Sequence, residues 1–156
     1  MPQMTKYEAT VRETRFRVLQ VGERLFGIPE SRIVEVSGPR AISPIPFAPP
    51  QIAGLVRREG HLLPAFDLRA CLGPSDGSLA RPDGLNVIIR REEDLVSFLV
   101  DGAEDVVSLR ADATSRSLPG EDLARGGLAV VDQGDRPLHI LCVDRVIDSV
   151  LEGLGG

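Results

Sequence analysis

The chain is most informative at residues 54–68, which read Gly54-Leu55-Val56-Arg57-Arg58-Glu59-Gly60-His61-Leu62-Leu63-Pro64-Ala65-Phe66-Asp67-Leu68. Two apolar runs flank a charged turn that contains glycine, and the second run ends in Asp-Leu. This pattern predicts a β-hairpin that leads into a short helix, with Asp67 as the N-cap and Gly73-Pro74 at the helix end. No catalytic arrangement is evident in it, so the segment favours a binding surface over an active site.

The composition of the 156 residues predicts an acidic protein with an aliphatic core. Hydrophobic residues make up 42% of the chain, which is enough for one domain or for two small joined ones. With 18 basic and 23 acidic residues the net charge is -5, which opposes binding to the phosphates of a nucleic acid. Trp is absent, so there are few aromatic rings on which bases could stack. We therefore expect no nucleic-acid partner, and a small-barrel module that binds nucleic acid or a metabolite is the least favoured alternative.

The cysteines and histidines indicate no metal or catalytic centre. Cys71 and Cys142 form no Cys-x-x-Cys pair, and His61 and His139 fit partly exposed strand positions. No nucleophile or phosphate-binding loop accompanies the acidic residues, so we expect a non-enzymatic protein without metal or cofactor. The sequence lacks a signal peptide and an apolar run of about 18 residues, which predicts a cytoplasmic protein that does not insert into membranes.

Strands dominate the predicted structure of the first half. A polar arm, residues 1–14, comes first, and the Gly22-Glu23 pair predicts a tight turn. The proline-rich passage 43–50 leads into the hairpin, and residues 74–84 have the composition of a connector. The strands predicted ahead of the hairpin are residues 16–21, 25–28 and 33–36.

The same order of elements returns in the second half, interrupted by a polar stretch at residues 110–126. Gly54 of the first half matches Gly127 of the second. This internal duplication, with a period of about 70 to 75 residues, predicts two similar subdomains at residues 15–73 and 85–142. The strands predicted in the second half are residues 85–90, 95–100, 106–109, 127–131 and 138–142.

The predicted fold is all-β. Short strands with frequent turns favour small barrels, because closure removes exposed edges, and we expect two five-stranded barrels packed together in one domain, residues 15–152. An amphipathic helix at residues 143–152 would then cover the barrels. Its apolar stripe consists of Val143, Val146, Ile147, Val150, Leu151 and Leu154.

Several short motifs resemble those of the CheW family, the adaptors of bacterial chemosensory arrays. They follow the family's order between Phe16 and Leu151, and they include Phe26-Gly27-Ile28, Glu35-Val36, Gly54-Leu55-Val56, Leu63-Pro64, Phe66-Asp67-Leu68-Arg69, Val100-Asp101-Gly102 and Leu138-His139-Ile140-Leu141. The resemblance implies two SH3-like barrels. It also implies an adaptor that couples the helical cytoplasmic tip of a chemoreceptor to the regulatory domain of a CheA-type histidine kinase, and that joins receptor arrays through these partners.

The resemblance further implies two binding surfaces. The kinase would contact the proline-rich passage and a neighbouring strand, through Ile42, Ile45, Phe47 and Gly54. The receptor helix would lie in a groove between the barrels, bordered by Ile33, Glu35, Arg57, Arg58 and Glu59. An apolar groove with a charged rim suits an amphipathic helix. Two simpler readings stay open, namely that the arginines form a solvated turn and that the prolines only stiffen a crossing between strands.

Three residues depart from the family's usual pattern. Glu59 stands where the family usually has arginine, Glu30 where it has an apolar residue, and Cys142 where it often has Asp. Glu35 and Glu59 would repel each other unless Arg57 or Arg58 lies between them. A divergent paralogue that has lost or rewired one partner is therefore the second alternative.

Overall fold

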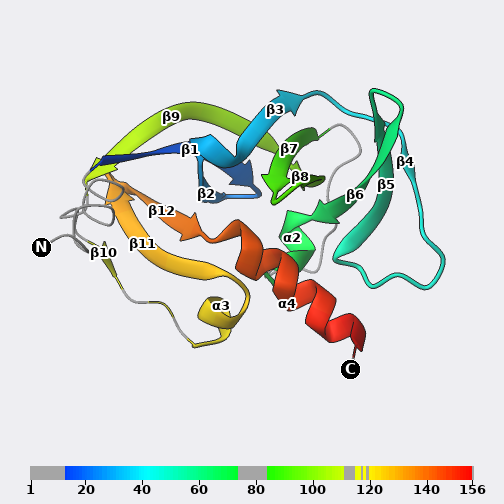
Figure 1. Ribbon diagram of the computed structural model, residues 1–156. Coiled ribbons are helices and arrows are strands. Elements are labelled where there is room, and N and C mark those ends of the chain that lie inside the picture. The colour runs from blue at the N-terminus through cyan, green and yellow to red at the C-terminus, as the bar shows by residue number, and fades with distance from the viewer. Residues whose placement is uncertain (1–12, 74–83, 111–114, 117, 119, 156) are drawn as a thin grey trace, which may run out of the picture.

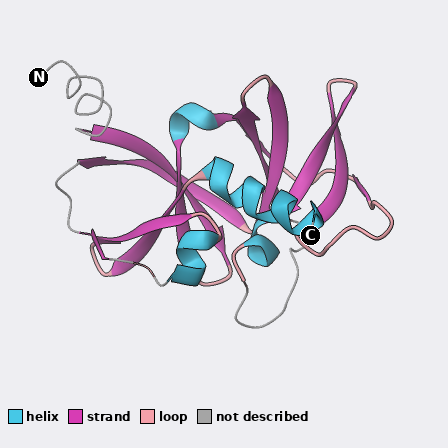
Figure 2. Cartoon of the chain, turned by 60° about the horizontal axis from the view of Figure 1, so that its bottom comes forward, coloured by secondary structure: helices cyan, strands magenta, loops and turns pink. Residues whose placement is uncertain are grey.

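The computed structural model describes residues 13–73, 84–110, 115–116, 118 and 120–155. The described part is built mainly of β-strands, and one long helix runs between two groups of them (Figures 1 and 2). The predicted arm (1–14) and connector (74–84) fall largely outside the described residues. The arm was predicted two residues too long, because Glu13 and Thr14 already pair with Arg110 and Leu109.

The two halves of the chain contribute matching sets of elements. The first half contains β1 (Glu13–Val21), β2 (Arg24–Pro29), the 3-10 helix η1 (Glu30–Arg32), β3 (Ile33–Ser37), β4 (Ile42–Ser43), β5 (Ile52–Arg58), β6 (His61–Asp67) and α2 (Leu68–Cys71). The second half contains β7 (Leu85–Arg91), β8 (Asp94–Val100), β9 (Gly102–Arg110), β10 (Ser115–Arg116), α3 (Gly120–Ala124), β11 (Gly127–Gln133), β12 (Arg136–Leu141) and α4 (Val143–Gly155). All strands predicted from the sequence are present, and the two-residue strands β4 and β10 are additional.

The polar stretch at 110–126 contains structure that its composition did not predict. Within the residues described there, β10 pairs with β11, and α3 forms a short helix. Elements of two and five residues are too short to show a hydrophobic period, which is why the pattern read as a loop.

The described strands form two six-stranded sheets of the same topology. One sheet has the order β10-β11-β12-β2-β1-β9, and the other has the order β4-β5-β6-β8-β7-β3. In each sheet an antiparallel hairpin lies between the other strands. It joins them through one parallel pair, β12 with β2 or β6 with β8, and one antiparallel pair, β1 with β9 or β7 with β3. The duplication read from the sequence is therefore visible in the strand order.

The hairpins are exchanged between the two halves of the chain. β1 and β2 pair with β9 and β12 of the second half, whereas β7 and β8 pair with β3 and β6 of the first half. The predicted sequence halves, 15–73 and 85–142, therefore do not coincide with the two sheets. The reason is that the chain passes to the other sheet after each hairpin, through η1 after β2 and through Asp101 after β8.

Buried side chains form three clusters. Two smaller ones belong to one sheet each, around Val18 and Leu138 in the first and around Val56 and Ile88 in the second. The largest lies between the sheets and takes residues from both halves of the chain. Four residues of the predicted α4 stripe are buried in it, namely Val143, Val146, Ile147 and Val150. At about 1.5–3 kcal/mol for each buried aliphatic side chain, this burial is what holds α4 across the sheets.

Candidate partner-binding surface

The predicted hairpin positions the candidate surface. β5 and β6 are joined by Glu59 and Gly60, which both have positive φ (50° and 81°), as in a type I′ turn. Asp67 caps α2 as predicted, because its Oδ1 accepts hydrogen bonds from the backbone N–H groups of Arg69 and Ala70 at 3.1 and 3.4 Å. The cap fixes the junction between β6 and α2, at the end of β6 opposite the turn.

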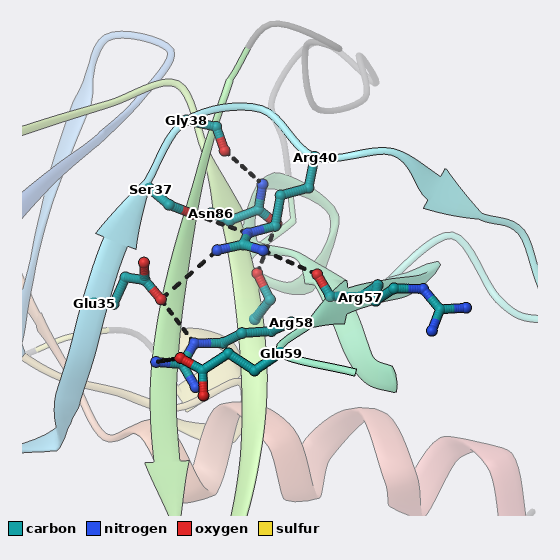
Figure 3. A network of polar contacts seen from close by, with 9 residues as sticks. Glu35, Ser37, Gly38, Arg40, Arg57, Arg58, Glu59 and Asn86 are labelled. Carbon is teal, nitrogen blue, oxygen red and sulfur yellow. Dashed lines mark hydrogen bonds and ion pairs between the residues drawn. The ribbon is translucent and has the colours of Figure 1, made fainter. Parts of the chain in front are cut away.

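Arg58 and Arg40 hold Glu35 at the surface (Figure 3). Arg58 Nε donates to Glu35 Oε1 at 2.7 Å, and Arg40 Nη2 lies 3.6 Å from the same oxygen. Arg58 Nη2 also lies 3.5 Å from Glu59 Oε2, so that Arg58 stands between the two carboxylates. The expected repulsion between Glu35 and Glu59 is therefore offset by Arg58.

This network lowers the pKa of the Glu35 carboxyl. The hydrogen bond from Arg58 is the main cause, and the positive charges of Arg58 and Arg40 act in the same direction. Reciprocally, the hydrogen bond to Glu35 raises the pKa of Arg58. The Glu35 side chain is 36% exposed, so a partner can reach this ion pair.

Three supporting residues were missed by sequence reasoning. Arg40 Nε donates to Ser37 Oγ at 3.0 Å, and its Nη1 donates to the Arg57 carbonyl oxygen at 2.9 Å. The buried Asn86 donates from its side-chain amide to the Gly38 carbonyl oxygen at 3.2 Å. Arg40 follows a proline in an irregular segment, where neither periodicity nor a turn motif reveals the direction of a side chain.

The other residues expected at the receptor site lie apart from the network. The Arg57 side chain is exposed and points away from Glu35 (Figure 3). Ile33, on β3, is partly buried against the central cluster. Of the two arginines proposed to separate the carboxylates, Arg58 has this position and Arg57 does not.

The residues expected at the kinase site include three exposed apolar side chains between β3 and β5. Ile42 and Ile45 are about two-fifths exposed, and Phe47 is fully exposed. Phe47 also has φ of 66°, a conformation that few non-glycine residues adopt. A strained loop that holds a phenylalanine in solvent is typical of an interaction surface.

Gly54 differs from these three, because it is buried beneath the loop. Its φ is 148°, and a Cβ built on it would lie 2.3 Å from the Ser43 carbonyl oxygen. The residue thus permits β4 to approach β5 and has no side chain to offer a partner.

An apolar groove of about 700 Å³ opens beside the Glu35 network. It lies between the β5–β6 turn, the β7–β8 turn and α4. Its strands therefore all belong to one sheet, whereas the groove expected for the receptor helix was between the two barrels. Its apolar lining includes Leu62, Pro64, Phe66, Val96, Ile147 and Leu151. Its charged lining is Arg58, Arg91, Glu93 and Asp94, together with His61. Among the residues expected at the receptor site, Arg58 lines this groove, and Glu35 is connected to it through Arg58. Ile45, which was expected at the kinase site, lines the groove as well.

The two remaining departures from the family's pattern are accommodated within the fold. Glu30 forms an ion pair with Arg17 at 3.1 Å. Cys142 precedes α4, and its N–H donates to the Gly126 carbonyl oxygen at 2.8 Å. Asp67 occupies the corresponding place at the end of β6 in the first half of the chain. Its N–H likewise donates to a carbonyl oxygen, that of Gln51, at 2.9 Å. Cys142 therefore stands where the duplication places Asp67.

The described residues contain no group of three or more His, Cys, Asp or Glu side chains that could hold a metal ion. Burial raises the pKa of the Cys71 thiol to about 12, which leaves it unreactive at neutral pH. His61 is exposed on β6, and the His139 ring lies 5.4 Å from that of Phe26. None of the described helices is long and apolar enough to span a membrane.

The profile of the CheW-like domain matches residues 15–151. The chain belongs to the CheW family. A solved structure with the same fold is that of the scaffolding protein TtCheW from Thermoanaerobacter tengcongensis, which is 20% identical and superposes with a TM-score of 0.72. The match covers 83% of this chain and 88% of that chain. Family membership and the all-β fold with a C-terminal helix, both expected from the sequence, are therefore confirmed.

Proposed function

We propose that this chain is a non-enzymatic chemotaxis scaffold, which couples the cytoplasmic tip of a chemoreceptor to the regulatory domain of a CheA-type histidine kinase. The observation that carries the proposal is the match to the CheW-like domain over residues 15–151. The solved relative TtCheW is itself described as a scaffolding protein. A scaffold needs two partner surfaces, and the geometry offers two candidates.

The first candidate surface is the loop that carries Ile42, Ile45 and Phe47, which we assign to the kinase. It adjoins the groove, because Ile45 also lines the groove. Its exposed apolar side chains lie on one short segment, and burial of a fully exposed phenylalanine is the kind of contact that dominates an interface. Gly54 supports this surface from below by allowing the close approach of β4.

The second candidate surface is the groove with the adjoining Glu35–Arg58 pair, which we assign to the receptor. Receptor tips in this family are helical hairpins, and a helix that presents apolar residues at positions i, i+3, i+4 and i+7 fits an apolar groove. Leu62 and Leu151 are exposed at its mouth, whereas Phe66 and Ile147 form its buried base. Simultaneous occupation of both surfaces would hold the kinase close to the receptor.

Titration calorimetry of the full chain with each cognate partner domain, separately, tests the proposal. We expect Phe47→Ser to weaken kinase binding at least about tenfold and to leave receptor binding unchanged, and Leu62→Ser to do the reverse. Leu128→Ser is the matched control, because Leu128 is also exposed but lies on β11 of the other sheet. The proposal fails if well-folded protein binds neither domain, and the assignment of surfaces fails if the control weakens binding as much as the other variants.

A further inference from the structure

The two hairpin tips that flank the groove differ in charge. The β5–β6 tip combines the exposed Glu59 with Arg57 and Arg58, and only Arg58 of these three lines the groove. The β7–β8 tip carries the exposed residues Glu92, Glu93 and Asp94, of which the last two line the groove. Any partner that enters the groove therefore meets unbalanced carboxylates on the β7–β8 side.

The arginines of the groove are paired with carboxylates other than Glu93 and Asp94. Arg58 is bound to Glu35 and Glu59, and Arg91 forms an ion pair with Asp148 of α4 at 2.5 Å. Within the described part of the chain, neither Glu93 nor Asp94 forms an ion pair with a basic side chain. The β7–β8 side of the groove is thus negative, beside an apolar base.

We propose that the groove accepts an amphipathic helix whose apolar stripe is flanked by lysine or arginine on the side that faces the β7–β8 tip. This inference rests on the proposed function, because the receptor tip is the helix assigned to this groove. It adds the charge pattern by which this chain selects its partner. Complementary charges at the rim of an apolar contact discriminate among partners more than they add affinity.

Two synthetic helical peptides of about 18 residues test this charge preference on the full chain. Both carry the same leucine stripe, and the flanking residues are lysine in one peptide and glutamate in the other. We expect the lysine peptide to bind at least about fivefold more tightly in NMR titrations, with shifts at the groove residues Leu62, Val96 and Leu151. The preference should shrink when the salt concentration is raised from about 0.05 to 0.5 M, because these charges are exposed.

Two double variants with the same change in net charge separate a local effect from the overall acidity of the chain. Glu93→Lys with Asp94→Lys should reverse the preference, because both side chains line the groove. Glu23→Lys with Asp135→Lys should preserve it, because these exposed residues lie on hairpin turns of the other sheet.

Each contrary result has a distinct meaning. Equal binding of the two peptides at the groove, or a reversal in the control variant as well, overturns the charge inference and leaves the proposed scaffold function intact. If neither peptide binds, the groove is not a helix site, which removes both this inference and the receptor surface of the proposed function. The kinase surface would then still be tested by the calorimetry of the Phe47→Ser variant.

Discussion

The position of one arginine determines how this chain tolerates an acidic turn. Arg57 and Arg58 are neighbours on β5, and consecutive strand residues point to opposite faces. Only one of them can therefore face Glu35, and the structure places Arg58 there. The sequence predicted that one of the two arginines must intervene, but not which one, because that depends on the register of the strand near its turn.

Replacement of Arg58 by glutamine should raise the pKa of Glu35 toward its ordinary value, near 4.5. The cause is the loss of the Arg58 hydrogen bond, which is the main reason for the lowered pKa. Because the folded-state pKa lies below the unfolded one, the ion pair stabilises the fold above pH 4.5. That contribution disappears as the pH falls through the folded pKa. NMR titration of the Glu35 side-chain carboxyl measures the shift.

Arg57→Gln is the matched control, since it removes the same charge from the neighbouring residue. The Glu35 titration should be unchanged in this variant, because Arg57 points away from the carboxylate. Equal pKa shifts in the two variants would mean that general surface charge, and not the Arg58 hydrogen bond, sets the ionisation of Glu35.

At the scale of the elements, the sequence predicted the structures that depend on contacts between residues close together in the chain. The β5–β6 hairpin and the Asp67 cap each depend on residues a few positions apart, and each was found as predicted. Of the α4 stripe, four residues are buried as predicted, whereas Leu151 and Leu154 are exposed. β4 was not predicted, because it is a two-residue strand held by its approach to β5. That approach depends on the absence of a side chain at Gly54, a requirement that no periodicity reveals.

Gly54→Ala should therefore destabilise the protein by roughly 2–4 kcal/mol, a cost that combines overpacking with backbone strain. The added Cβ would meet the Ser43 carbonyl oxygen at 2.3 Å, and φ of 148° is unfavourable for alanine. Urea unfolding measures the change. Gly38→Ala is the control, because no atom lies within 4 Å of a Cβ placed there. If both variants unfold at the wild-type midpoint, β4 is free to move away and the close approach is unimportant.

At the scale of the whole molecule, the two halves of the chain complete each other. The sequence revealed the duplication, because each half repeats the same local patterns. It did not reveal the exchange of hairpins, because the identity of a strand's pairing partner is not a local property. Each sheet requires strands from both halves, and the central cluster combines residues such as Phe26 and Phe66 with Phe98 and Val146. Neither half can bury its apolar surface alone.

The chain should consequently tolerate a break between residues 78 and 79, inside the predicted connector. We expect fragments 1–78 and 79–156 to be unfolded separately and to associate in a 1:1 complex when mixed, because the contacts between the halves resemble those of an obligate dimer. The measurement compares the mass of the complex by light scattering and its amide spectrum with those of the intact chain. A fragment that folds alone would show that the exchanged hairpin is dispensable.

One ion pair allows the strength of this association to be tested in a controlled way. Asp101 Oδ2 accepts from Arg69 Nη2 at 2.5 Å and from the Gly22 N–H at 2.6 Å, and both donors belong to the other half. Asp101→Asn in the second fragment should weaken its association about tenfold or more, since it removes a largely buried charged acceptor. Glu104→Gln should have little effect, because Glu104 pairs with Arg136 of its own half. Equal weakening by both changes would indicate that net charge governs the association of the fragments. A selective effect of Asp101→Asn would show that the association depends on the contact between Asp101 and the exchanged hairpin at Gly22.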